Sequence, residues 1–173
     1  MSNLTGQDSA ALAIRLATSE DAEAIARIYN HGIEERTTLE TELRTPEERR
    51  QWLAAHDARH PVYVALLENE VVGWASLNVF NQREAYRFVA DLSVYVAREL
   101  RGKGIGKVLM QKLIAVAPGL GLHKLVLATF PHLVAVKMYE SLNFRTVGFY
   151  REQGQLNGRW VDTQIMELIL DQA

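Results

Sequence analysis

Apolar and polar positions follow two different periods along the first third of the chain. Residues 14–17 alternate, which predicts a short strand, and apolar side chains over residues 22–33 recur at helical spacing. A polar loop over residues 34–44 separates this helix from a second one, which we expect to run to about Arg59. The second helix opens with the residues of a capped start: Thr45 as the cap, Pro46 at the first helical position and Glu48 reaching back.

The rest of the chain alternates apolar, β-branched segments with amphipathic stretches, and it predicts six more strands and two more helices. We expect the strands at 61–67, 71–79, 88–96, 125–129, 146–151 and 159–170, and the helices at 105–116 and 132–142. This order predicts one α/β domain over residues 14–171, with helices on both faces of a single sheet. Residues 1–13 are expected to form a flexible lead-in.

Composition narrows the classes of function. The 173 residues include 19 basic and 21 acidic side chains, and this near-balance argues against a nucleic-acid partner. No stretch approaches 18 consecutive apolar residues, and the chain start lacks the pattern of a secretory signal, so we expect a cytoplasmic protein without a membrane span. The absence of Cys excludes disulfides and a cysteine nucleophile.

A turn with three glycines in five positions, Gly102-Lys103-Gly104-Ile105-Gly106, joins the strand at 88–96 to the helix at 105–116. Glycines let backbone N–H groups approach a ligand, and the helix N-terminus adds partial positive charge, so the turn can seat a phosphate. Arg101 and Val108 break the Walker pattern, and Lys107 stands where a dinucleotide fingerprint needs its last glycine. The alternative is that the turn only connects the strand to the helix and binds no ligand.

The turn resembles the R/Q-x-x-G-x-G/A signature of the GNAT superfamily of acetyl-CoA-dependent N-acetyltransferases, as Arg101-x-x-Gly104-x-Gly106. The resemblance covers about residues 14–170 and implies a mixed, mostly antiparallel sheet of about seven strands. Within the superfamily, the chain is similar to the phosphinothricin acetyltransferases and related amino-acid N-acetyltransferases. The segments that carry this similarity are Ile28-Tyr29-Asn30-His31, Thr37-Thr38-Leu39-Glu40-Thr41-Glu42, Ala85-Tyr86-Arg87, Ser93-Val94-Tyr95-Val96 and Gly158-Arg159-Trp160-x-Asp162.

The resemblance implies acetyl-CoA as cosubstrate, no metal, and a set of CoA contacts from the strand, the turn and the following helices. These contacts are Ser93, Val94, Val96, Arg101, Gly102, Lys103, Gly104, Ile105, Gly106, His132 and Lys137. His132 and Ala135 stand where many members carry CoA-contacting Asn and Ser. Leu39 likewise stands where relatives often show Phe.

Two catalytic roles follow from the resemblance and the chemistry. An alkylammonium, with a pKa of roughly 10, attacks a thioester only after losing a proton, so the site needs a base. Asp91 occupies the position where the branch usually has a Glu base, and Tyr139 matches the Tyr that protonates the CoA thiolate. The alternatives are structural: a strand Asp paired with an Arg or a backbone N–H, and an amphipathic core Tyr.

Five residues are candidates for binding the amine substrate: Thr38, Glu40, Arg83, Tyr86 and Arg87. The planar guanidinium of arginine suits the carboxylate of an amino acid. The alternative is a solvated loop whose arginines lie on the surface and bind no substrate. His56 and His60 lack an obvious third ligand, so no metal site is indicated. The three tryptophans, Trp52, Trp74 and Trp160, are expected in the core or at an interface.

The leading hypothesis is an enzyme that acetylates the amine of a small molecule, an amino acid or a phosphinothricin-like analogue. A protein acetyltransferase acting on an N-terminus or a lysine is the second hypothesis, and a non-catalytic acyl-CoA-binding domain is the third. The resemblance also implies a homodimer. Trp160 and the apolar tail at 165–170 are candidates for its interface or, alternatively, for the core.

Overall fold

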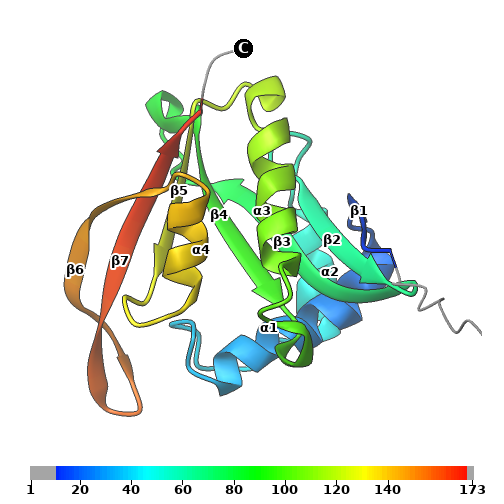
Figure 1. Cartoon of the computed structure of the whole chain (residues 1–173), viewed down its shortest axis with the longest axis horizontal. Helices are drawn as coiled ribbons and strands as arrows, with labels where there is room; N and C mark the ends of the chain where they lie inside the picture. The colour runs from blue at the N-terminus through cyan, green and yellow to red at the C-terminus, as the bar shows by residue number, and fades with distance from the viewer. Residues whose placement is uncertain (1–10, 171–173) are drawn as a thin grey trace, which may run out of the picture.

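The computed structural model of the protein describes residues 11–170, which form seven strands and four α-helices (Figure 1). The strands are β1 (Ala13–Leu16), β2 (Val62–Leu67), β3 (Glu70–Val79), β4 (Val89–Val96), β5 (Lys124–Thr129), β6 (Arg145–Leu156) and β7 (Arg159–Ile169). The helices are α1 (Ala22–Glu34), α2 (Pro46–Ala54), α3 (Ile105–Val116) and α4 (Ala135–Ser141). The expected fold is therefore confirmed. The predicted lead-in lies largely outside the described residues, and Ala13 at its end opens β1.

One sheet holds all seven of these strands in the order β1-β2-β3-β4-β5-β7-β6. Neighbours are antiparallel except β4 and β5, whose parallel register runs only from Val89 opposite Lys124 to Asp91 opposite Val126. Beyond Asp91 the two strands diverge, as Figure 1 shows. The sheet therefore opens between β4 and β5 and leaves one backbone edge of each strand without a strand partner.

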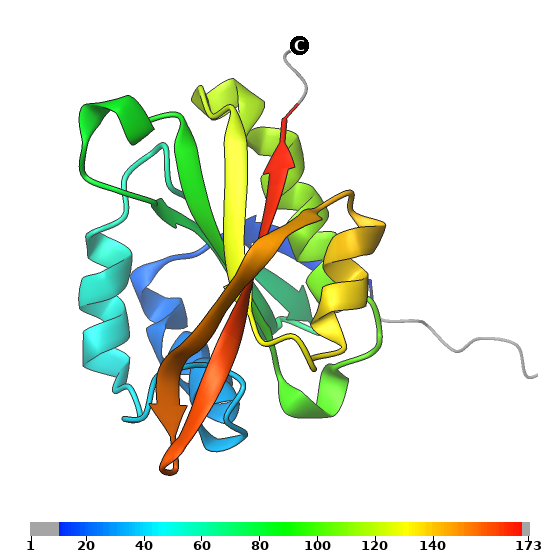
Figure 2. The ribbon, with the colours of Figure 1, turned by 90° about the vertical axis from the view of Figure 1, so that its left-hand side faces the viewer.

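Helices cover both faces of the sheet, α1 and α2 on one side and α3 and α4 on the other (Figure 2). On the α3 side, Leu109 and Leu113 are fully buried in a cluster that includes Leu125 of β5. On the α1 side, Ile25 packs with Trp74 of β3 in a separate cluster. Burying each such side chain stabilises the fold by roughly 1.5–3 kcal/mol. The helices on the two faces are thus anchored by separate hydrophobic clusters.

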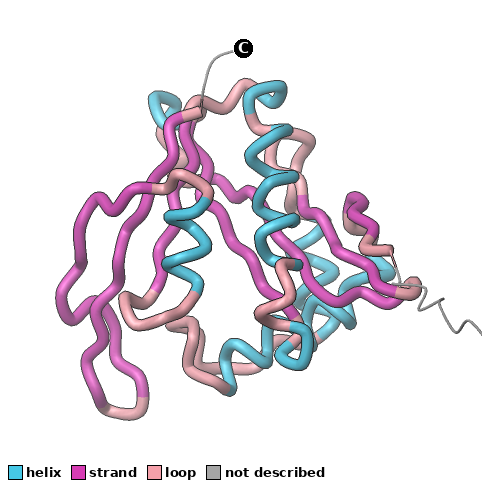
Figure 3. Tube along the Cα trace, in the orientation of Figure 1, coloured by secondary structure: helices cyan, strands magenta, loops and turns pink. Residues whose placement is uncertain are grey.

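Three predicted boundaries are wrong. The second helix ends at Ala54, because the Asp57 carboxylate accepts the backbone N–H groups of Arg59 and His60, both at 2.9 Å, and forms a turn. The fourth helix begins at Ala135 rather than 132, and a loop precedes it (Figure 3). β6 extends to Leu156, five residues beyond its predicted end. The sequence did not show this because two register shifts in the pairing of β6 with β7 interrupt the alternation typical of a strand. Within residues 11–170, no helix has the length and apolar character needed to cross a bilayer.

Candidate active site

A cavity of about 570 Å³ lies where β4 and β5 diverge. We call it the β4–β5 cavity; β4, the glycine turn, the start of α3, the end of β5 and α4 line it. It reaches from Thr129 on β5 and Tyr139 on α4 to Gly104 at the start of α3. The unpaired strand edges supply backbone donors and acceptors along one wall, which suits an extended ligand.

The glycine turn at one end of this cavity requires glycine at two positions. Gly102 and Gly104 have φ values of +75° and +86°, a region that L side chains rarely adopt. A Cβ added at either residue would meet no atom within 4 Å, so both turn an open face outward. Gly104 is also the N-cap of α3, a 12-residue helix. The turn thus places exposed backbone at the positive end of a helix dipole, the arrangement that the predicted anion site requires.

Arg101 in this turn is already engaged with α1. Its Nε donates to the Val96 carbonyl at 3.1 Å, and its guanidinium forms an ion pair with Glu35. The adjacent Arg98 pairs with Glu34, at 2.5 Å, and with Glu35. The turn is thus tied to the C-terminal end of α1, where the loop to α2 begins.

Tyr139 lines the other end of the β4–β5 cavity. It is 8% exposed, and burial raises the pKa of its hydroxyl to about 12. Its ring lies 6.2 Å from that of Phe144, centroid to centroid. Because the phenol stays protonated at neutral pH, it can act as a proton donor in the cavity.

Asp91 is the last residue of β4 that pairs with β5, next to the point where the two strands diverge. Burial raises the pKa of its carboxyl to about 6, and a hydrogen bond from the side chain of Asn78, opposite it on β3, acts against that rise. The strand alternation puts Asp91 on the same face of β4 as Ser93 and Tyr95. A carboxyl with this pKa is mostly ionised at pH 7 and can accept a proton.

A second cavity, of about 250 Å³, lies on the α1–α2 side of the sheet. We call it the aromatic cavity; its lining is Tyr29, Glu40, Arg44, Arg49, Trp52, Trp74, Asn78, Ser93 and Tyr95. Ring contacts hold its walls: Trp74 stacks on Tyr95 with centroids 4.8 Å apart, and Tyr29 meets Tyr95 edge-on at 4.9 Å. Ser93 and Tyr95 line both cavities, so the two spaces meet at β4.

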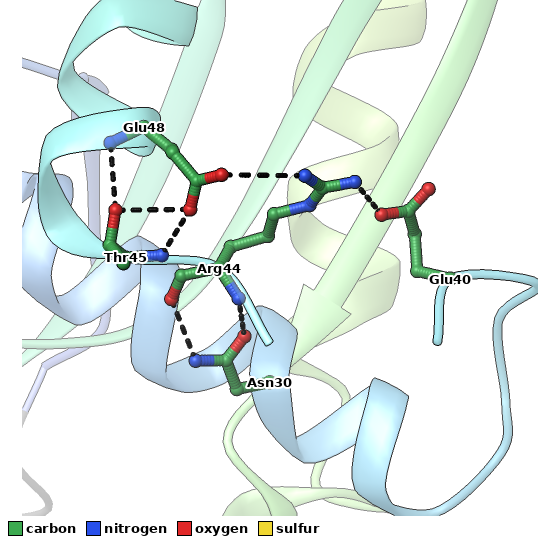
Figure 4. A network of polar contacts seen from close by, with 5 residues as sticks. All are labelled: Asn30, Glu40, Arg44, Thr45 and Glu48. Atoms are coloured by element: carbon green, nitrogen blue, oxygen red, sulfur yellow. Dashed lines mark hydrogen bonds and ion pairs between the residues drawn. The ribbon is translucent and has the colours of Figure 1, made fainter. Parts of the chain in front are cut away.

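A network of polar contacts fixes the loop that closes the aromatic cavity (Figure 4). The Asn30 amide clamps the backbone of Arg44, donating to its carbonyl at 2.9 Å and accepting from its N–H at 2.8 Å. Thr45 and Glu48 form the predicted capping box of α2. The Arg44 guanidinium forms ion pairs with Glu40 and Glu48. The wall is therefore built by local contacts within one segment of the chain.

The chain matches known proteins over this whole framework. The model of the acetyltransferase (GNAT) family matches residues 25–144. YwnH of Bacillus subtilis is 36% identical over 158 residues, 90% of this chain and 97% of that protein. The L-methionine sulfoximine/L-methionine sulfone acetyltransferase of Pseudomonas paraeruginosa is 35% identical, covering 91% of this chain and 94% of that protein. The crystal structure of a phosphinothricin acetyltransferase from Sinorhizobium meliloti with AcCoA superimposes with a TM-score of 0.87, at 30% identity over 92% of this chain and 88% of that one.

The chain belongs to the GNAT family of acetyltransferases. The predicted resemblance is confirmed, and the chain is an acetyl-CoA-dependent N-acetyltransferase. The β4–β5 cavity fits acetyl-CoA, because its glycine turn leaves open space where added side chains would stand. Acetyl-CoA supplies the activated acetyl group.

Most of the CoA contacts that the GNAT resemblance implied line the β4–β5 cavity: Ser93, Val94, Val96, Arg101, Gly102, Gly104, Ile105 and Gly106. The cavity lining does not include Lys103, His132 or Lys137. Ala135, the second departure from the family pattern, does line it. Asp91 lines neither cavity but is separated from Ser93 by a single residue. The CoA contacts and the two catalytic roles stay predictions for these residues.

The five residues predicted to bind the amine substrate fall into two groups. Glu40 lines the aromatic cavity, and Thr38 hydrogen bonds to Tyr29 and Tyr95, two of its walls. The other three are exposed between β3 and β4, outside this lining: Arg83, Tyr86 and Arg87. Arg87 pairs with Glu84 at 2.8 Å.

Sequence reasoning missed the side chains that α2 and β3 give to the aromatic cavity. Arg49 and Trp52 lie three residues apart, so they share one face of α2, and this spacing is the signal that was available. Trp74 was expected in a core or interface and is 1% exposed, yet it also lines the cavity. Among the described residues, no group of three or more His, Asp or Glu side chains could hold a metal ion.

Proposed function

We propose that this enzyme acetylates the amine of an amino acid or a phosphinothricin-like analogue. The observation that carries the proposal is the meeting of the two cavities at Ser93 and Tyr95 of β4. One space suits acetyl-CoA, and the other opens from the opposite face of the sheet onto the same strand. Relatives named as acetyltransferases of methionine sulfoximine, methionine sulfone and phosphinothricin support the same acceptor class.

Asp91 and Tyr139 act at the two ends of the transfer in this proposal. The Asp91 carboxylate takes the proton of the acceptor ammonium, directly or through water, and its raised pKa makes it a stronger base than an ordinary carboxylate. Tyr139 donates its hydroxyl proton to the departing thiolate, and burial keeps it protonated until then. Ion pairs of Arg98 and Arg101 with Glu34 and Glu35 hold the glycine turn against α1 while both substrates are bound.

Thiol release from acetyl-CoA tests the function. The purified protein is assayed with a panel of free amino acids, methionine sulfone, phosphinothricin and short peptides, with hydrolysis of acetyl-CoA alone as the blank. We expect turnover with free amino acids or their analogues and little with peptides. Turnover of peptides alone would instead support a protein acceptor, and acetyl-CoA binding without any turnover would contradict the proposal.

We also propose that the protein forms a homodimer through the β6–β7 edge of the sheet. β6 is an edge strand, and it exposes Phe149 and Tyr150, while β7 exposes Trp160. An exposed strand edge with apolar side chains favours pairing with another chain. Of the apolar tail, Met166 and Leu170 are buried in the core, whereas Ile169 is exposed. Sedimentation at micromolar concentration tests this, and a monomer would contradict it.

A further inference from the structure

The aromatic cavity contains an arginine whose guanidinium has no polar partner. We propose that this residue, Arg49, binds the carboxylate of the acceptor and makes the enzyme specific for α-amino acids with a free carboxyl group. The inference rests on the proposed function and narrows its acceptor. It assigns to α2 the role that the sequence had suggested for Arg83 and Arg87.

Arg49 is held in place without using its hydrogen-bond donors. Its guanidinium carbon lies 4.6 Å from the centroid of the Tyr29 ring and 5.1 Å from that of Trp52. Such cation–π contacts fix the position of the group but leave its N–H donors free. The guanidinium forms no ion pair or hydrogen bond with any residue in 11–170, and its buried Nε has no partner.

The carboxylates near Arg49 are taken by another residue. Arg44 forms ion pairs with both Glu40 and Glu48, and Glu48 also accepts the backbone N–H of Thr45 at 2.6 Å (Figure 4). Arg44 therefore holds both carboxylates in direct contact, whereas Arg49 pairs with neither of them. Burial lowers the pKa of the Arg49 guanidinium, and the attraction of Glu40 and Glu48, which it does not contact directly, offsets this only in part.

The remaining polar groups of the cavity also favour an anionic ligand. Trp74, which is 1% exposed, has an indole Nε1 without a partner, and this atom can only donate. The Asn78 Oδ1 is already in contact with the Ser76 hydroxyl and with the His56 Nε2, each at 3.2 Å. The cavity thus has hydrogen-bond donors without partners, and its carboxylate is already paired. This arrangement is complementary to a ligand that carries a carboxylate.

The size of the cavity and its position match an α-amino acid. Its volume of about 250 Å³ lies below the roughly 300–1,000 Å³ of sites for drug-sized ligands. It extends from Arg49 on α2 to Ser93 on β4, close to Asp91. A carboxylate at Arg49 leaves the amine of the same small molecule for the β4 end. A peptide N-terminus has an amide in place of this carboxylate and leaves Arg49 unpaired.

The test compares L-methionine sulfone with its carboxamide, which keeps the amine and side chain and removes only the negative charge. We expect the parent enzyme to prefer the carboxylate on the order of 10²-fold in kcat/KM, the effect of losing one buried, hydrogen-bonded charge pair. Arg49→Gln should erase this preference by raising the KM for the sulfone, while the KM for acetyl-CoA stays unchanged. Arg49→Lys should keep part of the preference, because it retains the charge and loses the planar fork.

The matched control is Arg50→Gln on the same helix, where the arginine is exposed and pairs with Glu47. It should leave the preference intact. A folded Arg49→Gln protein that still prefers the carboxylate would overturn the assignment, and so would a parent enzyme that uses both probes equally.

A binding measurement separates this inference from the proposed function. Trp52 and Trp74 line the cavity, so tryptophan fluorescence in the presence of CoA reports occupancy without turnover. We expect the parent protein to bind the sulfone in preference to its carboxamide, and Arg49→Gln to lose that difference. If neither probe is acetylated, the proposed acceptor class fails while this titration still decides the role of Arg49. Equal affinity of the parent protein for the sulfone and its carboxamide would overturn the inference. So would a failure of the parent protein to bind either probe.

Discussion

The two cavities that meet at β4 are built in different ways. The β4–β5 cavity owes its form to backbone: strands that stop pairing after Asp91, and a turn whose Gly102 and Gly104 adopt left-handed φ values. The aromatic cavity is made of side chains from α1, α2, β3 and β4 and of the loop around Glu40. A backbone site depends on a few positions that tolerate only one residue type. A side-chain site depends on how distant segments pack, and its residues can be exchanged to change the acceptor.

The first prediction breaks the backbone site. Gly104→Val forces a β-branched residue to adopt a φ of +86°, at a cost of about 1–3 kcal/mol, and places its side chain in the open face of the turn. We expect acetyl-CoA affinity to fall by at least about 10²-fold, with a loss of about 2–4 °C in Tm for each kcal/mol. Calorimetry and thermal melts measure the two effects. Gly119→Val is the control, since this glycine also has open space around it but no left-handed φ; unchanged affinity in folded Gly104→Val would refute the anion site.

The second prediction removes one proton donor from the same cavity. Tyr139→Phe deletes only a hydroxyl, and no described residue accepts a hydrogen bond from it, so we expect an unchanged Tm. Loss of a general acid lowers kcat by about 10²–10⁴-fold. Steady-state kinetics with saturating acetyl-CoA measures this. Turnover at the parent rate would mean that water supplies the proton and that Tyr139 is a core residue.

The third prediction concerns Asp91, two positions before Ser93, where the two cavities meet. Asp91→Asn should lower the rate about 10²-fold at pH 7 and by less near pH 10, where neutral amine is already abundant. The raised pKa of Asp91 also makes the folding stability of the parent protein depend on pH. With its pKa raised from 3.8 to about 6, the folded carboxyl holds a proton more tightly than the unfolded one, so stability is lost as pH rises from about 4 to 6.

The difference between the Tm of Asp91→Asn and that of the parent should therefore increase in favour of the variant as the pH rises over this range. Melting curves from pH 4 to 8, measured beside the pH–rate profile, test both statements. A purely structural Asp91 would give a lower Tm in the variant at neutral pH and normal turnover of the folded fraction.

The contrast between the cavities also explains which features the sequence could predict. Glycine spacing, the Thr45–Glu48 capping box and the alternation in β4 are local signals, and the structure bears them out. The role of Arg49 has no such signal, because it depends on Arg44 taking both nearby carboxylates and on Tyr29 lying under the guanidinium. The end of α2 was missed for a related reason: a turn at Asp57, formed by side-chain contacts, ends a helix that the sequence period allows to continue.

The last and smallest prediction perturbs only the aromatic cavity, from a distance. A Cβ on Gly154 of β6 would lie 2.5 Å from Cδ2 of Leu39, the residue next to Glu40 in the cavity wall. Gly154→Ala should therefore push the Leu39 side chain and its loop, at modest cost because the contact is the end of a flexible side chain. We expect the acceptor KM to rise about threefold, the effect of roughly 0.7 kcal/mol, with the KM for acetyl-CoA unchanged. Gly148→Ala on the same strand meets nothing within 4 Å and is the control. If Gly154→Ala instead altered the binding of acetyl-CoA, a change in the aromatic cavity would also affect the β4–β5 cavity. The distinction between a backbone site for acetyl-CoA and a side-chain site for the acceptor would then have no functional consequence.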